Sequence, residues 1–314
     1  MPDLVLPSLP ARARRLVYLG SPQVAVGPLQ VLIAAGFEVA LVISRPDRRR
    51  GRGAALTPSP VKAAALQAGL PTSDDVNDAG QVGADLGVVV AFGRLIKADL
   101  LSVLPFVNLH FSLLPRWRGA APVERAVLAG DVITGVCVMA IEEGLDTGGV
   151  YRRAELAINA GETVSELRER LAHQGGDLLL DCLRNGFGPA VPQEGEVHYA
   201  AKIDPAELRL DWTAEASQLV RVVALERAWT TFRGKRLLIA QARVAPDVAV
   251  EQGHHPDQDG GAVPGTMVRR DDAVLVRAGS GWLELVEVQP EGRVRQAAAD
   301  WRNGSRLSDG ELLQ

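Results

Sequence analysis

Short apolar runs alternate with helical patterns over the first 185 residues, and this alternation limits the fold more than any other feature of the chain. Five runs have the length and composition of buried strands, at 15–20, 38–44, 86–91, 106–111 and 135–141. Three segments between them carry apolar residues at helical spacing, at 24–35, 60–69 and 121–130. Strands that alternate with helices form a doubly wound parallel sheet. We therefore expect an α/β domain with a Rossmann-like parallel sheet.

The chain after this region is organised differently. Thr163 to Glu166 has the spacing of a capping box and opens a long amphipathic helix that ends at Asn185-Gly186. A helical pattern at 214–226 then precedes several short strand patterns separated by turn signals, which predicts a small β-barrel. The expected boundaries are a first domain at 14–186, a linker at 187–203, a second domain at 204–303 with a mobile insertion at 246–264, and a tail at 304–314.

The composition is that of a globular protein. The chain has 314 residues, of which 47% are hydrophobic, and a formal net charge of −4. No apolar run reaches the roughly 18 residues that a transmembrane helix needs, and no signal-peptide pattern is present at the start, so we expect a cytoplasmic protein. No coiled-coil pattern is present, which favours a monomer. Cys137 and Cys182 lie in apolar segments without metal-ligand spacing, so we expect core residues and no metal.

Two polar residues interrupt the apolar run at 106–111. Asn108 and His110 are two positions apart in an extended strand, so both side chains leave the same face. Pro115 cannot continue a strand ladder, so the chain turns there and leaves the pair near the carboxyl end of the strand, where open parallel sheets bind ligands. Asp146 follows the next apolar run in a glycine-containing loop, and it faces His110 if the two strands are neighbours.

These three side chains suit acyl transfer without a protein nucleophile. A carboxylate beside an imidazole fixes the tautomer of the ring and favours its protonated form, and the amide of Asn108 can donate a hydrogen bond to a developing oxyanion. The structural alternative is a satisfied core residue, which is the usual role of a single histidine in an apolar strand. The compatible placement of Asn108, His110 and Asp146 favours the catalytic interpretation.

A basic segment, Arg45 to Gly53, follows the second expected strand. It holds five arginines and one acidic residue in nine positions, although the chain as a whole is acidic. Because the segment leaves the same sheet edge as Asn108 and His110, it favours the docking of an anionic substrate across the site. The alternative is a solvated, flexible loop that binds nothing.

Longer motifs around these residues resemble methionyl-tRNA formyltransferases. In the first half of the chain the motifs are Asn108 to Pro122, Gly144 to Gly148 and Arg45 to Lys62. In the second half they are Tyr199 to Lys202, Leu210 to Trp212 and Ala228 to Phe232. The resemblance covers nearly the whole chain, from about Arg14 to about Arg302.

The resemblance implies transfer of a formyl group from the co-substrate 10-formyltetrahydrofolate to the α-amine of methionyl initiator tRNA, for translation initiation. It implies that Asn108, His110 and Asp146 are the catalytic residues and that the amine itself attacks the formyl carbon. Asn108 and protonated His110 would stabilise the tetrahedral oxyanion. Asp146 would hold His110 in its charged form and help to move the proton from the amine to the departing folate nitrogen.

The resemblance also implies binding residues. The implied folate-binding residues form a turn and the wall of a pterin pocket: Ser112, Leu113, Leu114 and Pro115, with Val89, Val90, Ala91, Phe92, Gly93, Leu95 and Ile96. The implied tRNA-binding residues lie in the basic segment and its continuation: Arg45, Arg48, Arg49, Arg50, Arg52 and Lys62. Arg52 is expected to contribute most. The resemblance also implies that the carboxyl-terminal barrel is OB-like and lies along the tRNA.

Two other functions fit part of the sequence. A folate-dependent formyltransferase for a sugar or ribonucleotide amine would keep the three polar residues and the folate turn, but it would have no use for the basic segment and the barrel. A tRNA-binding protein without catalysis would use Asn108, His110 and Asp146 only for structure. Substitution of His110 separates the last alternative, because a binding protein would keep its tRNA affinity and lose no turnover.

Overall fold

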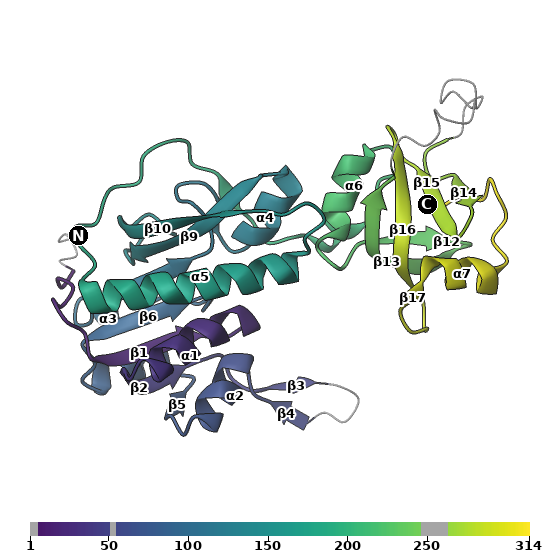
Figure 1. Ribbon diagram of the computed structural model, residues 1–314. Helices are drawn as coiled ribbons and strands as arrows, with labels where there is room; N and C mark the ends of the chain where they lie inside the picture. Colours follow the sequence, from purple (N-terminus) through teal and green to yellow (C-terminus); the bar gives the residue numbers. More distant parts are fainter. Residues whose placement is uncertain (1–5, 51–54, 246–262) are drawn as a thin grey trace. The chain divides into compact units, whose positions relative to one another are not determined.

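The computed structural model describes residues 6–50, 55–245 and 263–314, and these residues form two compact units (Figure 1). The first unit contains the residues up to Val123 together with 132–157 and 167–201. The second contains 124–131, 158–166 and the chain from Lys202 onward. Arg52 and nearly all of the expected insertion at 246–264 lie outside the described residues. None of the described helices is long and apolar enough to cross a membrane.

The first unit is built on a seven-stranded sheet in the order β10-β9-β7-β6-β1-β2-β5. The five strands from β7 to β5 are parallel, which confirms the predicted α/β class. β9 is antiparallel to β7, and β10 is antiparallel to β9. The strand bounds are β1 (Arg15–Gly20), β2 (Glu38–Ile43), β5 (Thr72–Ser73), β6 (Leu86–Val90), β7 (Phe106–His110), β9 (Ile133–Ala140) and β10 (Val150–Ala157).

The two antiparallel strands depart from the expected fully parallel sheet. The loop 141–149 joins β9 to β10 without a helix, and a short connection of this kind permits only antiparallel pairing. β10 is also absent from the sequence prediction. It is an edge strand that exposes Arg152, Arg153 and Glu155, so it has no continuous apolar run to reveal it.

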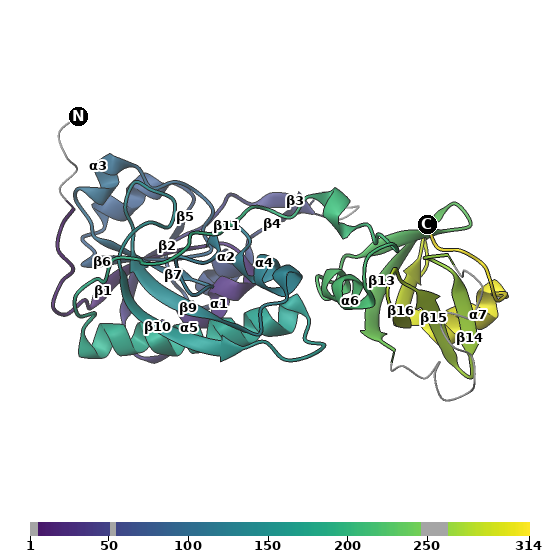
Figure 2. The same ribbon diagram turned by 90° about the horizontal axis from the view of Figure 1, so that it is seen from above.

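Helices cover both faces of this sheet (Figure 2). α1 (Val26–Ala34) and α5 (Val164–Asn185) lie on one face. On the other face, η2 (Val76–Gln81) and α3 (Ala98–Leu101) pack on Val89 and Phe106 in an apolar core. The remaining elements of this part of the chain are η1 (Gln23–Ala25), β3 (Arg48–Arg50), β4 (Ala55–Thr57), α2 (Pro60–Gln67), β8 (Arg118–Gly119), α4 (Pro122–Ala129) and β11 (Tyr199–Ala200).

The second unit is a curled antiparallel sheet, a half-barrel, around its own apolar core. The sheet has the order β12-β13-β16-β15-β14, with β17 paired to β16, and the core includes Trp212 and Trp301. Its elements are η3 (Pro205–Leu208), α6 (Ala216–Val223), β12 (Trp229–Phe232), β13 (Lys235–Val244), β14 (Met267–Arg270), β15 (Ala273–Arg277), β16 (Trp282–Pro290), β17 (Gln296–Ala297) and α7 (Ala298–Ser305).

The carboxyl-terminal residues belong to this half-barrel, although the sequence suggested a separate tail at 304–314. Leu312 forms a β-bridge with Thr266 beside β14, and Leu313 forms one with Phe232 of β12. Leu313 is 2% exposed in the core. The end of the chain therefore connects the two edge strands of the sheet, which leaves less of either edge open to solvent.

Gly135 allows β9 and β10 to approach each other closely. A Cβ atom at this position would lie 2.2 Å from the carbonyl oxygen of Ala154 on β10 and 2.6 Å from the side chain of Leu113. Ala154 contributes a main-chain atom that cannot move without moving the strand. The pairing of β9 with β10 therefore depends on the missing side chain of Gly135.

Gly135→Ala should lower the free energy of unfolding by about 1–3 kcal/mol, because the added methyl group forces β10 and Leu113 to shift. Equilibrium unfolding in urea measures this change. The matched control is Gly27→Ala in α1, where a Cβ atom meets nothing within 4 Å. The control should leave the stability unchanged or raise it, by up to about 1 kcal/mol. Equal effects of the two substitutions would contradict the close-approach explanation.

Candidate active site

The structure brings Asn108, His110 and Asp146 together on one face of β7. Leu109 packs under α5 at Gly175, so its two strand neighbours, Asn108 and His110, point to the opposite face. The Nδ1 atom of His110 lies 3.7 Å from Oδ2 of Asp146. The amide of Asn108 has no hydrogen-bond partner among the described residues. Because the residue is only partly buried, its amide remains available to a ligand.

The imidazole of His110 is held on both sides. It is 5% exposed, and its Nε2 atom lies 2.9 Å from the main-chain oxygen of Trp117. A carbonyl oxygen can only accept a hydrogen bond, so Nε2 carries a proton. The other nitrogen, Nδ1, faces the Asp146 carboxylate at 3.7 Å, which is longer than a hydrogen bond. These two contacts fix the orientation of the ring.

Asp146 reaches His110 because the loop 141–149 folds back over the sheet. The Oδ2 atom of Asp146 accepts a hydrogen bond of 2.8 Å from the main-chain N–H of Gly119. Two residues later, a Cβ atom at Gly148 would lie 2.1 Å from the Ala140 carbonyl oxygen at the end of β9. The glycine thus lets the loop turn tightly against the strand it has just left.

Three non-glycine residues of the first unit have a left-handed backbone, and all three lie at this site. Ala91 follows β6 with a φ of 46°, Trp117 has a φ of 65°, and Asp146 has a φ of 52°. Among the described residues of this unit no other non-glycine residue has a positive φ. Such conformations cost free energy and persist where the surroundings enforce them, often at functional sites.

Cys137 lies beside His110 but cannot act as a nucleophile. The two residues are paired across β7 and β9, and the thiol is fully buried in a small apolar cluster with Leu114 and Met139. Burial raises the pKa of the Cys137 thiol, because the thiolate loses its hydration. This confirms the expectation of a core cysteine.

The turn after β7 is ordered by its own side chains. The hydroxyl of Ser112 is fully buried and donates a hydrogen bond of 2.6 Å to the Arg116 carbonyl oxygen. Leu114 is buried and joined to Pro115 by a cis peptide bond, and Leu113 packs on Gly135 of β9. The four residues suggested to bind folate therefore form a compact turn directly beyond His110.

The suggested pterin wall divides into two sets. Four of its side chains face the core with at most 7% exposure: Val89, Val90, Phe92 and Ile96. Three of its residues are exposed: Ala91, Gly93 and Leu95. The buried set positions the segment after β6. Only the exposed set can contact a ligand without rearrangement, and Gly93 can do so only through its main chain.

The basic segment rises from the carboxyl end of β2 as a short hairpin of β3 and β4. Its base is fixed by buried hydroxyl groups: Ser44 contacts both Ser21 and Ser59, and Ser21 accepts a hydrogen bond from the main-chain N–H of Arg45. Lys62 donates a hydrogen bond of 2.7 Å to Asp47, so its ammonium group serves the base of the hairpin. Arg48 and Arg49 stand on the hairpin itself, as does the main chain of Arg50.

Sequence reasoning missed Gln193, whose side chain joins two parts of the site. Its Nε2 atom donates to the main-chain oxygens of Asp146 and Gly148, both at 2.8 Å, and its Oε1 atom accepts from Arg118. The sequence placed this residue in the linker 187–203, but residues up to Ala201 belong to the first unit. No local pattern marks a residue that acts through contacts this distant in sequence.

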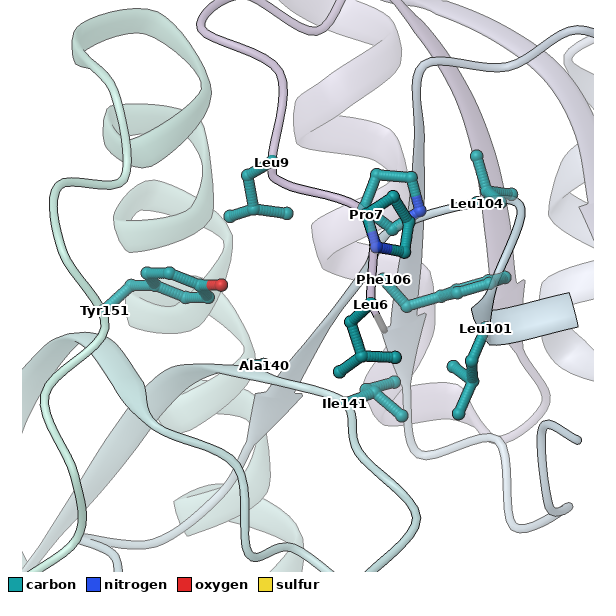
Figure 3. A pocket seen from close by; sticks show the side chains of 10 residues that line it. Leu6, Pro7, Leu9, Leu101, Leu104, Phe106, Ala140, Ile141 and Tyr151 are labelled. Carbon is teal, nitrogen blue, oxygen red and sulfur yellow. The ribbon is translucent and has the colours of Figure 1, made fainter. Parts of the chain in front are cut away.

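A cavity of about 60 Å³ lies elsewhere, beside the amino end of β7 (Figure 3). Apolar side chains surround it, among them Leu6 and Pro7 from the described start of the chain, Phe106 from β7 and Ile141 from the loop after β9. Ligand sites for small molecules have volumes of about 300–1,000 Å³. This cavity is too small for a folate, and none of Asn108, His110 and Asp146 lines it.

Residues that could bind a metal ion are not grouped. Within the part of the chain that the structure describes, no three His, Cys, Asp or Glu side chains converge as ligands. His110 and Asp146 make one such pair, and the remaining contacts of this pair are to main-chain groups.

Comparison with known proteins confirms the family that the motifs suggested. The family model described as "Formyl transferase" matches residues 16–183, and the model described as "Formyl transferase, C-terminal domain" matches residues 202–306. The chain belongs to the formyltransferase family. As a formyltransferase it is an enzyme. The first match covers most of the first unit, and the second match lies within the second unit.

Relatives of this formyltransferase agree along nearly the full chain. The methionyl-tRNA formyltransferase of Symbiobacterium thermophilum is 39% identical over 94% of this chain and 94% of its own length. That of Streptomyces coelicolor is 41% identical over 95% of this chain and 99% of its own. Among solved structures, HypX from Aquifex aeolicus in complex with tetrahydrofolic acid has a TM-score of 0.62 at 18% identity. The structural match covers 93% of this chain and 47% of HypX, so the two proteins share a fold over this region.

Proposed function

We propose that this enzyme transfers the formyl group of 10-formyltetrahydrofolate to the α-amine of methionyl initiator tRNA, as a monomer in the cytoplasm, for translation initiation. The observation that carries the proposal is the similarity to methionyl-tRNA formyltransferases across both units, at 39% and 41% identity for the two relatives above. The juxtaposition of Asn108, His110 and Asp146 supports it, because this set of groups can promote attack by an amine without a protein nucleophile.

In the proposed reaction the α-amine attacks the formyl carbon and forms a carbon–nitrogen bond. The carbonyl electron pair moves to oxygen, and the collapse of this oxyanion breaks the bond to the folate N10. The proton lost by the amine is taken up by N10, so formylmethionyl-tRNA and tetrahydrofolate are the products. The chemistry needs no metal, because a cationic imidazole and an amide donor can stabilise the oxyanion.

The contacts of His110 define how it contributes. Both of its ring nitrogens face protein oxygens, those of Trp117 and Asp146. His110 therefore acts on the oxyanion through its positive charge, and the direct hydrogen bond comes from the unpaired amide of Asn108. Asp146 stabilises the charge on His110 and lies close enough to assist the proton transfer.

The folate is proposed to bind between the turn 112–115 and the segment after β6. The exposed residues of that segment, Ala91, Gly93 and Leu95, present main-chain groups and one large apolar side chain to the ligand. Flat heterocycles are bound by apolar surfaces with a few converging polar groups. The buried Ser112 and Leu114 keep the turn in place.

The tRNA is proposed to contact the basic segment and a local face of the second unit. From Lys202 onward the chain carries 15 Lys and Arg residues against 17 Asp and Glu residues, so the unit is not basic as a whole. Arg209 and Arg236 nevertheless both lie against the ring of Trp229, at 5.8 Å and 4.6 Å from its centroid. Paired guanidinium and indole groups suit contacts with phosphates and with unstacked bases. The second domain at 204–303 is accordingly proposed to bind tRNA.

Formylation of charged initiator tRNA tests the proposal directly. The purified protein is incubated with 10-formyltetrahydrofolate and methionyl initiator tRNA, and parallel reactions contain methionyl elongator tRNA, sugar amines or glycinamide ribonucleotide. Product on the initiator alone is expected. Product on a sugar or ribonucleotide amine would replace the proposed substrate, and no formylated product in any reaction would favour a binding protein without catalysis.

His110→Ala and Asp146→Asn should each lower kcat by roughly 10²- to 10⁴-fold, because each removes part of the charge stabilisation and proton transfer. Asparagine tolerates the left-handed backbone of Asp146 and can still accept from Gly119, so the second variant changes mainly the charge. Folate affinity, measured by calorimetry, should stay within a few fold. The control is His173→Ala on α5, whose side chain is 80% exposed. Wild-type turnover in either variant would remove the assigned roles.

Arg52→Ala should weaken the productive use of tRNA. The value of kcat/KM for tRNA should fall, and the slope of its logarithm against the logarithm of salt concentration should become shallower by about 1, as expected for one lost phosphate contact. Kinetics across a salt series measure both quantities. Arg184→Ala removes an exposed arginine at the end of α5 and should change neither. If Arg52→Ala behaves like Arg184→Ala, the basic segment has no role in tRNA binding.

A further inference from the structure

Gln193 makes four hydrogen bonds with one carboxamide group. Its Nε2 atom donates to the main-chain oxygens of Asp146 and Gly148, both at 2.8 Å. Its Oε1 atom accepts from Nε and Nη2 of Arg118, at 2.9 Å and 2.7 Å. An amide has two donors and two acceptor lone pairs, so every position is used. The orientation is also fixed, because the flipped group would place oxygen against two carbonyls and N–H against a guanidinium.

The two parts that Gln193 joins are the parts that hold the His110–Asp146 pair. The turn that contains Arg118 provides the Trp117 carbonyl for His110 and the Gly119 N–H for Asp146. The loop 141–149 provides Asp146 itself. The loop 141–149 contains no helix or strand, and the turn contains only the two-residue strand β8, so the relative position of the two segments depends on bonds of this kind.

The chain on both sides of Gln193 continues the same connection. Val191 exchanges two main-chain hydrogen bonds with Val150, at 2.8 Å and 2.9 Å, directly after the loop of Asp146. Further on, β11 pairs with β8, and the His198 carbonyl accepts from the N–H of Arg118 at 2.9 Å. We call residues 191–200 the strap. It is bonded at one end to Val150 of β10, directly after the Asp146 loop, and at the other end to the Arg118 turn. Gln193 is bonded to both the loop and the turn.

We propose that Gln193 is a positioning residue, which holds the Asp146 loop against the Arg118 turn and thereby sets the geometry of His110 and Asp146. The expected loss of turnover rests on the proposed function. The expected release of the Asp146 loop rests on the structure alone. Gln193 touches no reacting group and acts through the main chain of Asp146. Displacement of a catalytic group by about 1 Å can cost on the order of 10²-fold in rate, so a side chain of this kind can matter for turnover.

The most informative variant is Gln193→Glu, which keeps the hydrogen-bond acceptor of the side chain and removes its donor. Glutamate keeps an acceptor for Arg118 and strengthens it with charge, but it replaces the donor that faces Asp146 and Gly148 with an oxygen. The strap should remain attached to the Arg118 turn while the Asp146 loop is released. Gln193→Ala removes both halves. The neighbouring Glu194→Ala is the matched control, because Glu194 is exposed and forms no hydrogen bond or ion pair among the described residues.

Both Gln193 variants should show kcat lowered by roughly 10- to 100-fold with KM for folate and tRNA little changed, because Gln193 is not among the residues proposed to bind either substrate. Hydrogen exchange of the amides at 145–149 should become faster in both variants and not in Glu194→Ala. The ring nitrogen NMR signals of His110 should shift in both. A purely structural role would lower the melting temperature without altering kcat of the folded fraction.

Two results would contradict the positioning role of Gln193. Wild-type kcat in Gln193→Glu would show that the donor contacts do not position Asp146. Unchanged exchange at 145–149 would show that Gln193 does not hold the loop. If the wild-type enzyme does not formylate methionyl-tRNA, the proposed function fails by itself. Hydrogen exchange and the His110 signals then still decide the positioning role, since neither measurement needs substrate.

Discussion

The antiparallel pairing of β9 with β7 is the constraint on which the candidate site depends. β9 ends beside the amino end of β7, so a chain that simply continued would carry Asp146 away from His110. The loop 141–149 must instead reverse over the face of the sheet before β10 begins. Gly148 permits the tight approach to Ala140, and the left-handed Asp146 completes the reversal. The position of the carboxylate is thus a consequence of strand direction.

The fold class followed from sequence because period and run length are local properties. The alternation of strands and helices predicts the parallel part of the sheet, and the spacing of Asn108 and His110 predicts their common face. The proximity of Asp146 to His110 was expected for a neighbouring strand, and 3.7 Å separates the two groups. The sequence does not predict the path of the chain from β9 through Asp146 to β10. Strand direction depends on long-range packing, and β10 has the polar pattern of an edge strand.

Other features of the site have no local signal at all. The Trp117 carbonyl and the Gly119 N–H are main-chain atoms, which every residue possesses, so a sequence cannot mark them as partners of His110 and Asp146. Gln193 lies 47 residues from Asp146 in a segment rich in glycine and proline, which favours the interpretation as a linker. The base of the basic segment also has no local signal, because Ser21, Ser44 and Ser59 come into contact only after β1 and β2 have paired.

The bond between His110 and the Trp117 carbonyl has a consequence for evolution and for engineering. No change of side chain can delete a main-chain oxygen, so Nε2 keeps its hydrogen-bond acceptor whichever residue stands at position 117. Variation at position 117 can alter the indole and its contact with Arg116 while the acceptor survives. Selection on this contact must therefore act on the path of the backbone. Insertions or deletions between 112 and 119 would change that path and, with it, the position of the acceptor.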